Sequence, residues 1–240
     1  GNEELGLSFL RQYHSELFPQ LPSNGHFNER RTRLGPLIEQ IRCWLTVQEG
    51  LLTTTDPVRL IDSAPIFVAT YGRGGDNQTL TGHEYFGVAS SHGAKVFGLR
   101  LDITTSHDQV IDQWMLAPAS YHDSTTMPAL VEDQNDLLLI GDGAYHNPTV
   151  EPVLHHHHQI DVLAPPRQDS RLYAWSKAAI QTVARFRRPI ESAFSVLATV
   201  FNIEHPQARS LHGLVSRIAT RILAYTCSFV MNNYLALLTG

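Results

Sequence analysis

Cysteine is scarce in this chain of 240 residues. The two cysteines, Cys43 and Cys227, lie far apart in the sequence and have none of the spacings that cysteine metal ligands share. The sequence therefore offers neither a cysteine metal site nor a disulfide framework. We expect two buried thiols in a reducing compartment.

The chain also lacks a long uninterrupted apolar run. Its most apolar stretch, 222–238, is interrupted by Asn232 and Asn233. It is short and polar for a membrane span, which needs about 20 apolar residues. We therefore expect a buried helix there, no membrane partner and a location in the cytoplasm.

Basic residues are missing from one large part of the chain. Residues 101–165 contain ten Asp and Glu and no Lys or Arg, whereas 166–240 contain nine Lys and Arg against three acids. The net charge of −5 argues against a simple nucleic-acid coat. The asymmetry is consistent with an acidic site beside a basic face that meets phosphates, or with ordinary solvated surface.

Hydrophobic periodicity predicts one order of elements along the chain. We expect a small N-terminal helical region, 1–55, followed by a domain, 56–240, with a mixed α/β sheet flanked by helices. The predicted elements are helices at 5–18 and 28–49 with a loop at 18–27, a strand at 58–70, a loop at 71–92, strands at 94–103 and 109–117, a short helix from about 124, a strand at 137–140, a helix at 148–157, a strand at 159–164, and helices from 171 onward that are broken near Pro189 and Pro206.

Three carboxylates stand at informative places in this order. Asp62 lies in the middle of a predicted buried strand, where a charge needs a partner or a metal. Asp142 follows the strand at 137–140 beside Gly143, at the kind of strand end where α/β folds bind ligands, although a turn aspartate would look the same. Glu191 borders an apolar helix face, where it would be a metal ligand or would form an ion pair with Arg187.

Three other groups of polar residues have simpler interpretations. His155 to His158 resemble a metal tract, but we interpret them as an exposed helix end. Arg30, Arg31 and Arg33 open the predicted helix at 28–49, where they either support a packed subdomain or contact nucleic acid. Asp123 or Ser124 is expected to cap the short helix, and His122 is either part of that cap or catalytic.

Four motifs carry a resemblance to a known family: IDSAPI around Asp62, PASYHD at 118–123, IGDGAY around Asp142, and RRPIESAFSVL around Glu191. With this order of elements, the chain resembles the ribonuclease-H-like DDE transposases. The match is to the IS4/IS5-like superfamily and, within it, to the IS982 family of insertion sequences.

This resemblance implies a catalytic triad of Asp62, Asp142 and Glu191 that binds two Mg²⁺ or Mn²⁺ ions. The implied reaction is DNA strand cleavage at the ends of a mobile element, followed by strand transfer into target DNA. The implied partners are the terminal inverted repeats, target DNA and a second copy in a homodimer, in the bacterial cytoplasm at the nucleoid. The expected DNA-binding residues are Arg187, Arg188, Arg209, Arg217 and Arg221.

The chain departs from related families at two positions. Those families carry a Tyr three residues before the Arg that corresponds to Arg187, and a Lys seven residues after the Glu that corresponds to Glu191. This chain has Ala184 and Ala198 at these positions. Phosphate contacts made by that Tyr and Lys are therefore in doubt. A catalytically inactive DNA-binding remnant of a transposase stays an alternative, as does a nuclease that acts on other nucleic acids.

Overall fold

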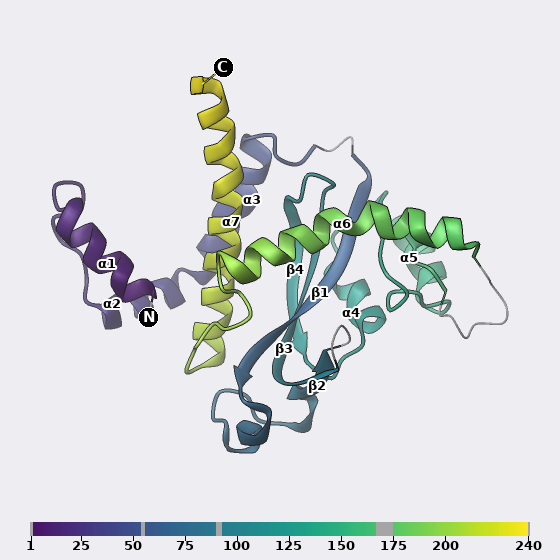
Figure 1. The fold of residues 1–240 in the computed structure, drawn as a ribbon, viewed down its shortest axis with the longest axis horizontal. Helices are drawn as coiled ribbons and strands as arrows, with labels where there is room; N and C mark the ends of the chain where they lie inside the picture. Colours follow the sequence, from purple (N-terminus) through teal and green to yellow (C-terminus); the bar gives the residue numbers. More distant parts are fainter. Residues whose placement is uncertain (1, 54–55, 90–92, 167–174, 240) are drawn as a thin grey trace.

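The computed structural model describes residues 2–53, 56–89, 93–166 and 175–239. Within this part of the chain, a six-stranded sheet is flanked by helices on both faces (Figure 1). The strands are β1 (Val58–Ala69), β2 (Phe86–Ala89), β3 (Ala94–Thr105), β4 (Ile111–Pro118), β5 (Leu138–Ile140) and β6 (Asp161–Leu163). The helices are α1 (Asn2–Tyr13), α2 (Asn24–Arg33), α3 (Gly35–Gln48), α4 (Asp123–Leu130), α5 (Glu151–His158), α6 (Lys177–Thr199) and α7 (Leu211–Thr239).

The sheet is mixed, with β1 at its centre. β1 pairs antiparallel with β3, and β3 pairs antiparallel with both β2 and β4. On its other side β1 pairs parallel with β5, which pairs parallel with β6. The predicted α/β class, a mixed sheet flanked by helices, is confirmed.

Successive residues of β1 serve two separate cores, because side chains alternate between the faces of a strand. Leu60 packs with Ile190, Leu197 and Leu214, so α6 and α7 cover its face of the sheet. Ile61 packs with buried residues of α4 and α5 on the opposite face. Figure 1 shows α6 crossing β1. The strand thus presents every second side chain to α6.

The helix expected at 28–49 is two helices, α2 and α3. Gly35 and Pro36 open α3, and Pro36 supplies no N–H to continue a helix from before it. α2 begins earlier than expected, at Asn24, because the Ser23 hydroxyl accepts a hydrogen bond from the His26 amide. Both helices pack against α7. The division of the chain near residue 55 stays a prediction.

Pro189 neither starts nor breaks a helix, which corrects the expectation from sequence. α6 begins at Lys177, where the Ser176 hydroxyl accepts from the Ala179 amide, and continues through Pro189 to Thr199. Ile190, Ala193 and Leu197 are fully buried, and their packing keeps the helix intact at the proline. The helices expected from residue 171 lie partly outside the described residues.

α7 is less buried than expected. Its first half is buried at Leu214, Ile218 and Ile222, whereas Leu237 and Leu238 near its end are about four-fifths exposed. Its second half projects from the body of the protein (Figure 1). By length and composition alone, α7 is able to cross a membrane. Of its most apolar stretch of 18 residues, 17% is buried inside the protein. Length and composition are weak evidence for a membrane span, and the expectation of a buried helix is wrong for the second half.

The loop expected at 71–92 and the two thiols also differ from expectation. The described part of that loop contains the short helices Tyr71–Asp76 and His83–Tyr85 and the strand β2, which pairs with β3. Cys43 is exposed and Cys227 is half-buried, so the prediction of two buried thiols is wrong.

Candidate active site

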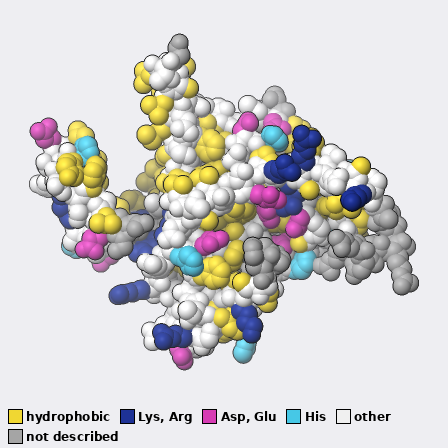
Figure 2. Space-filling view, in the orientation of Figure 1, with side chains coloured by type: hydrophobic (Ala, Val, Ile, Leu, Met, Phe, Trp, Pro, Cys, Tyr) yellow, Lys and Arg dark blue, Asp and Glu magenta, His cyan; other side chains and the backbone are white. Residues whose placement is uncertain are grey.

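Asp62 lies within β1, and Asp142 lies two residues past the end of the neighbouring parallel strand β5. Leu60 of β1 is in register with Ile140 of β5, and each aspartate lies two residues beyond its member of this pair. Parallel neighbours lie about 4.8 Å apart, and residues two apart share a face. The pairing therefore places Asp62 and Asp142 side by side on the face that α6 covers. Figure 2 shows acidic and basic side chains gathered there.

Asp62 forms an ion pair with Arg187 of α6. Arg187 Nη2 donates to Asp62 Oδ2 at 2.9 Å, and the Ser63 amide donates to Asp62 Oδ1 at 2.9 Å. The side chain of Arg187 is 11% exposed and that of Asp62 is 21% exposed. The alternative of an ion pair between Arg187 and Glu191 is therefore replaced, among the described residues, by a pair that joins the helix to the central strand.

Burial raises the pKa of Asp62 from 3.8 to about 6. The Arg187 guanidinium and the Ser63 amide lower it, whereas the charges of Asp142 and Asp123 raise it further. Even with an arginine bound, this carboxyl thus lies in surroundings that disfavour its negative charge. A second positive charge would stabilise the ionised form.

Glu191 is exposed, one helical turn beyond Arg187 on the helix that packs against β1 and β5. Residues four apart lie on the same side of a helix. Glu191 therefore lies on the same side of α6 as Arg187, which binds Asp62 of β1. However, no three His, Cys, Asp or Glu side chains within the described ranges lie close enough to hold a metal ion. The structure brings together Asp62 and Asp142, and Glu191 does not complete a three-carboxylate cluster with them.

Two further carboxylates near the site, Asp123 and Asp102, lie on the opposite face of the sheet, and no role in the site was predicted for them. Asp123, at the start of α4, accepts a hydrogen bond from the Ser63 hydroxyl at 2.7 Å and forms an ion pair with Arg100 at 2.5 Å. His122 caps the helix instead, since its Nδ1 accepts from the Ser124 amide at 3.3 Å. Ser63 is thus bound to Asp123 through its side chain and to Asp62 through its backbone.

Asp102 is the second carboxylate that sequence reasoning missed. It lies within β3, is 1% exposed, and accepts from the Thr126 hydroxyl at 3.2 Å through Oδ1. Burial, followed by the charge of Asp123, raises its pKa from 3.8 to about 7. Its Oδ2 and the hydroxyl of Tyr145 are buried without hydrogen-bond partners among the described atoms. A charged residue inside the apolar run of β3 was the signal, the same one that identified Asp62.

The carboxylate pair suits a hard divalent cation in its chemistry. Mg²⁺ and Mn²⁺ prefer oxygen ligands, and carboxylates are their usual side-chain ligands in proteins. Asp142 Oδ1 accepts from the Ala144 amide at 2.8 Å, which orients this carboxylate. The two aspartates therefore have the donor chemistry for the metal that the family resemblance implies, although Arg187 binds Oδ2 of Asp62.

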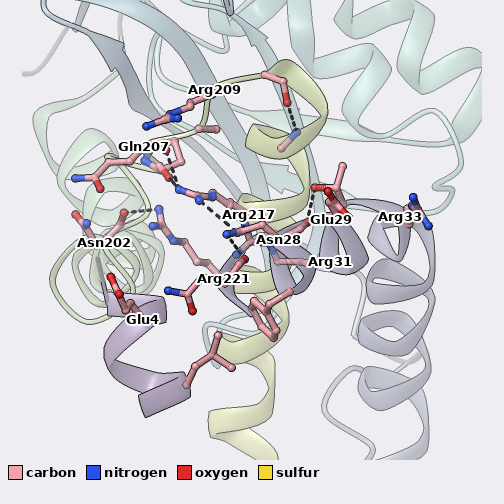
Figure 3. Close-up of a pocket in the computed structure, with 18 residues that line it drawn as sticks. Glu4, Asn28, Glu29, Arg31, Arg33, Asn202, Gln207, Arg209, Arg217 and Arg221 are labelled. Carbon is pink, nitrogen blue, oxygen red and sulfur yellow. Dashed lines mark hydrogen bonds between the residues drawn. The ribbon is translucent and has the colours of Figure 1, made fainter. Parts of the chain in front are cut away.

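A separate basic cavity of about 790 Å³ lies between α2, the start of α7 and the segment 202–210 (Figure 3). It contains three of the five arginines expected to bind DNA, together with two arginines of α2 and two acids. These lining residues are Arg209, Arg217, Arg221, Arg31, Arg33, Glu4 and Glu29. Arg187 and Arg188 lie elsewhere, on α6, where Arg188 is exposed.

Two arginines of this cavity also bind the segment that precedes α7. Arg217 Nη1 donates to the carbonyls of Pro206 at 2.7 Å and Gln207 at 2.8 Å. Arg221 Nη1 donates to the carbonyl of Asn202 at 2.7 Å. These bonds give both residues a structural role, whereas Arg209 is exposed at the cavity.

The four consecutive histidines lie at the end of α5, as expected. His155, His156 and His157 are exposed, and His155 Nδ1 lies 2.9 Å from Asp161 Oδ1 at the start of β6. The prediction of an exposed helix end is confirmed.

Comparisons with known proteins identify one family. The family model described as "Transposase DDE domain" matches residues 53–227. A comparison with curated proteins found no match. Among solved structures, the chain is similar to the Mos1 transposase paired-end complex with left transposon end, at 11% identity and a TM-score of 0.28. That similarity covers 73% of this chain and 63% of the Mos1 chain.

Proposed function

Because the chain belongs to the Transposase DDE domain family, we propose that it is a metal-dependent DNA nuclease and strand transferase of the IS982 type. It would cleave DNA at the ends of a mobile element and join those ends to target DNA. Asp62, Asp142 and Glu191 are the proposed catalytic carboxylates, with Mg²⁺ or Mn²⁺ as cofactor. We place this activity in the bacterial cytoplasm, at the nucleoid.

The observation that carries the proposal is the position of the two aspartates. Asp62 and Asp142 each lie two residues beyond the paired residues Leu60 and Ile140, on the face covered by α6. The charge of Asp142 raises the pKa of Asp62, and a carboxylate held beside another carboxylate is costly for folding. A fold keeps such a pair when the pair binds a cation or takes part in chemistry.

The roles of these residues follow from their contacts. Asp62 and Asp142 would hold the cations, and Glu191 would join them from α6 when the helix and sheet close on bound DNA. Two such ions supply an activated water or DNA 3′-hydroxyl and stabilise the leaving oxygen. The Ser63 and Ala144 amides each donate to Oδ1 of an aspartate and so restrict the rotation of the two side chains.

The basic residues form two proposed DNA contacts. Arg188 is exposed on α6, near the carboxylates, and suits the phosphates around the cleaved bond. The cavity that Arg209, Arg217 and Arg221 share with two arginines of α2 suits a phosphate of the same duplex at a more distant position. Both terminal-repeat and target DNA, and a second copy of the chain, are the proposed partners.

The test is cleavage of the native element ends by the purified protein with Mg²⁺ or Mn²⁺. We expect nicking by the wild type, and a loss of at least about a hundredfold, roughly 3 kcal/mol of barrier, in Asp62→Asn, Asp142→Asn and Glu191→Gln. Arg185→Gln, a change in the same helix outside the proposed site, is the matched control and should cleave normally. Wild-type rates in all three carboxylate variants would disprove the proposed triad.

The inactive remnant is the second candidate, and one observation favours it. The described residues contain no three-carboxylate group able to hold a metal, and Arg187 binds one of the two aspartates. A remnant would bind element-end DNA with a salt-dependent affinity yet show no Mn²⁺ binding that Asp62→Asn removes. Calorimetry with Mn²⁺ therefore separates the two candidates without any assay of cleavage.

A further inference from the structure

Arg187 has an unusual combination of contacts. The whole residue, backbone and side chain together, is 9% exposed. Its Nη2 donates to Asp62 Oδ2 at 2.9 Å. Its Nε is buried without a hydrogen-bond partner in the described structure. A guanidinium binds carboxylate or phosphate best through two parallel N–H groups, and this one donates to Asp62 through one nitrogen. The bonding of Arg187 is therefore incomplete in the absence of a further ligand.

The partner of Arg187 is also the residue that the proposed function assigns to a cation. A carboxylate oxygen that accepts a short bond from a guanidinium is less available to a divalent ion, and the two positive charges would repel each other. An incoming cation must therefore displace Arg187 from Asp62 Oδ2 or bind there weakly. A displaced and buried guanidinium in turn needs another anion.

A DNA phosphate is an anion of the required chemistry. Its oxygens accept two parallel N–H bonds from arginine, which would use the Nε that lacks a partner. Arg188, the next residue along α6, is exposed and would contact the same backbone. We propose that Arg187 couples DNA binding to metal binding, by leaving Asp62 for a DNA phosphate and thereby releasing Asp62 Oδ2 to a divalent cation.

This inference rests on the proposed function, because it assumes that Asp62 binds a cation. Its consequence is thermodynamic: DNA must raise the affinity for the cation, and the cation must raise the affinity for DNA by the same factor. Before DNA binds, Arg187 neutralises Asp62 and keeps the cation affinity low. A merely structural ion pair would produce no such coupling.

The experiment measures Mn²⁺ binding by calorimetry at about pH 8, where protons compete little for carboxylates, with and without DNA. The DNA is a short random-sequence duplex, checked on a gel after each titration. Wild type is compared with Arg187→Gln, with Arg187→Lys, and with Arg188→Gln as the matched control that loses the same charge from the same helix. Thermal melting in EDTA verifies that each variant is folded, and Asp62→Asn reports on the site itself.

We expect DNA to tighten Mn²⁺ binding to the wild type by about fivefold or more, a typical coupling between sites. Arg187→Gln should bind Mn²⁺ more tightly than the wild type without DNA and gain little when DNA is added. Arg188→Gln should bind DNA more weakly and keep the wild-type coupling. Arg187→Lys, which keeps the charge, should retain part of the coupling, so this variant still tests the proposal if Arg187→Gln does not fold.

Two results would overturn the inference. Mn²⁺ binding to Arg187→Gln that is no tighter than to the wild type would show that Arg187 does not compete for Asp62. An undiminished effect of DNA in that variant would show that the coupling comes from elsewhere. In contrast, Mn²⁺ binding that survives Asp62→Asn would contradict the proposed function itself, so the two failures are distinguishable.

Discussion

Arg187 Nη2 lies 2.9 Å from Asp62 Oδ2, and this ion pair joins the long helix α6 to the central strand β1. The two residues are 125 positions apart in the chain. Their contact makes the state of one carboxylate depend on the position of a helix. The stability of the fold and the chemistry of the site are therefore linked at this point.

The stability of the protein should fall as the pH rises through about 6 and about 7. Asp62 has a pKa of about 6 and Asp102 a pKa of about 7, both above the ordinary value of 3.8. A carboxyl whose pKa is higher in the folded state than in the unfolded state stabilises the fold at low pH and loses this contribution as it ionises. Urea unfolding of the metal-free protein at pH values from about 4 to about 8 would measure the effect, because this interval covers the pH range over which both carboxyls titrate.

Asp102→Asn should abolish the part of this pH dependence that Asp102 contributes, a fall in stability that is complete just above pH 7. The asparagine keeps an oxygen for the Thr126 hydroxyl and never ionises. We expect the unfolding free energy at about pH 8 to rise by roughly 2–4 kcal/mol over the wild type, and to be nearly unchanged at about pH 4. An equal change at both pH values would contradict the assignment of the pKa to Asp102.

Asp123→Asn should destabilise the fold more than Ser63→Ala. The asparagine removes the ion pair of the partly buried Arg100 and leaves it only the more distant charge of Asp102, which costs about 3 kcal/mol. Ser63→Ala removes one hydroxyl bond and leaves the ion pair intact, so a loss of about 1 kcal/mol is expected. Ser63→Thr keeps the hydroxyl and is the control. Equal losses in the two variants, measured by urea unfolding, would show that the ion pair contributes little.

Arg217 and Arg221 should differ from Arg209 in what their loss changes. Arg217→Ala and Arg221→Ala each remove charged hydrogen bonds to backbone carbonyls of 202–207. The loss of each such bond should lower the free energy of unfolding by at most about 1.5–3 kcal/mol. Arg209→Ala should leave the melting temperature unchanged and lower the salt dependence of DNA binding by about one unit of log–log slope. An unchanged slope in Arg209→Ala would remove the cavity from the DNA interface.

Replacement of His155 to His158 by Gln should leave strand cleavage within a few-fold of the wild type. Three of these side chains are exposed at the end of α5, and His155 contacts Asp161, outside the candidate site. The assay is cleavage of the native element ends. A loss as large as that of Asp62→Asn would place the histidines in the active site.

The sheet and the places of the two aspartates in it could be predicted from the sequence, because both depend on local patterns. The apolar run around Asp62 and the strand that ends before Asp142 have no competing interpretation in a mixed sheet. Parallel pairing then brings the two residues together without further information.

Long-range partners could not be predicted in the same way. Arg187 lies four residues before Glu191, and this spacing suggested a pair within one helix, whereas the tertiary packing of α6 sends Arg187 to β1. Asp102 was overlooked although it carries the same signal as Asp62, a charge within an apolar strand. The course of α6 through Pro189 also depends on packing, since the residue's own preference is to interrupt a helix.

The proline in α6 has a mechanical consequence. Pro189 has no N–H to donate to the carbonyl of Arg185, so the turn that separates Arg187 from Glu191 contains one hydrogen bond fewer than its neighbours. The bending stiffness of the helix is therefore lowest between these two side chains. Arg187 lies on one side of this turn, and Glu191 lies on the other, in a segment anchored by Ile190, Ala193 and Leu197. A rotation at that turn would move Arg187 relative to Glu191.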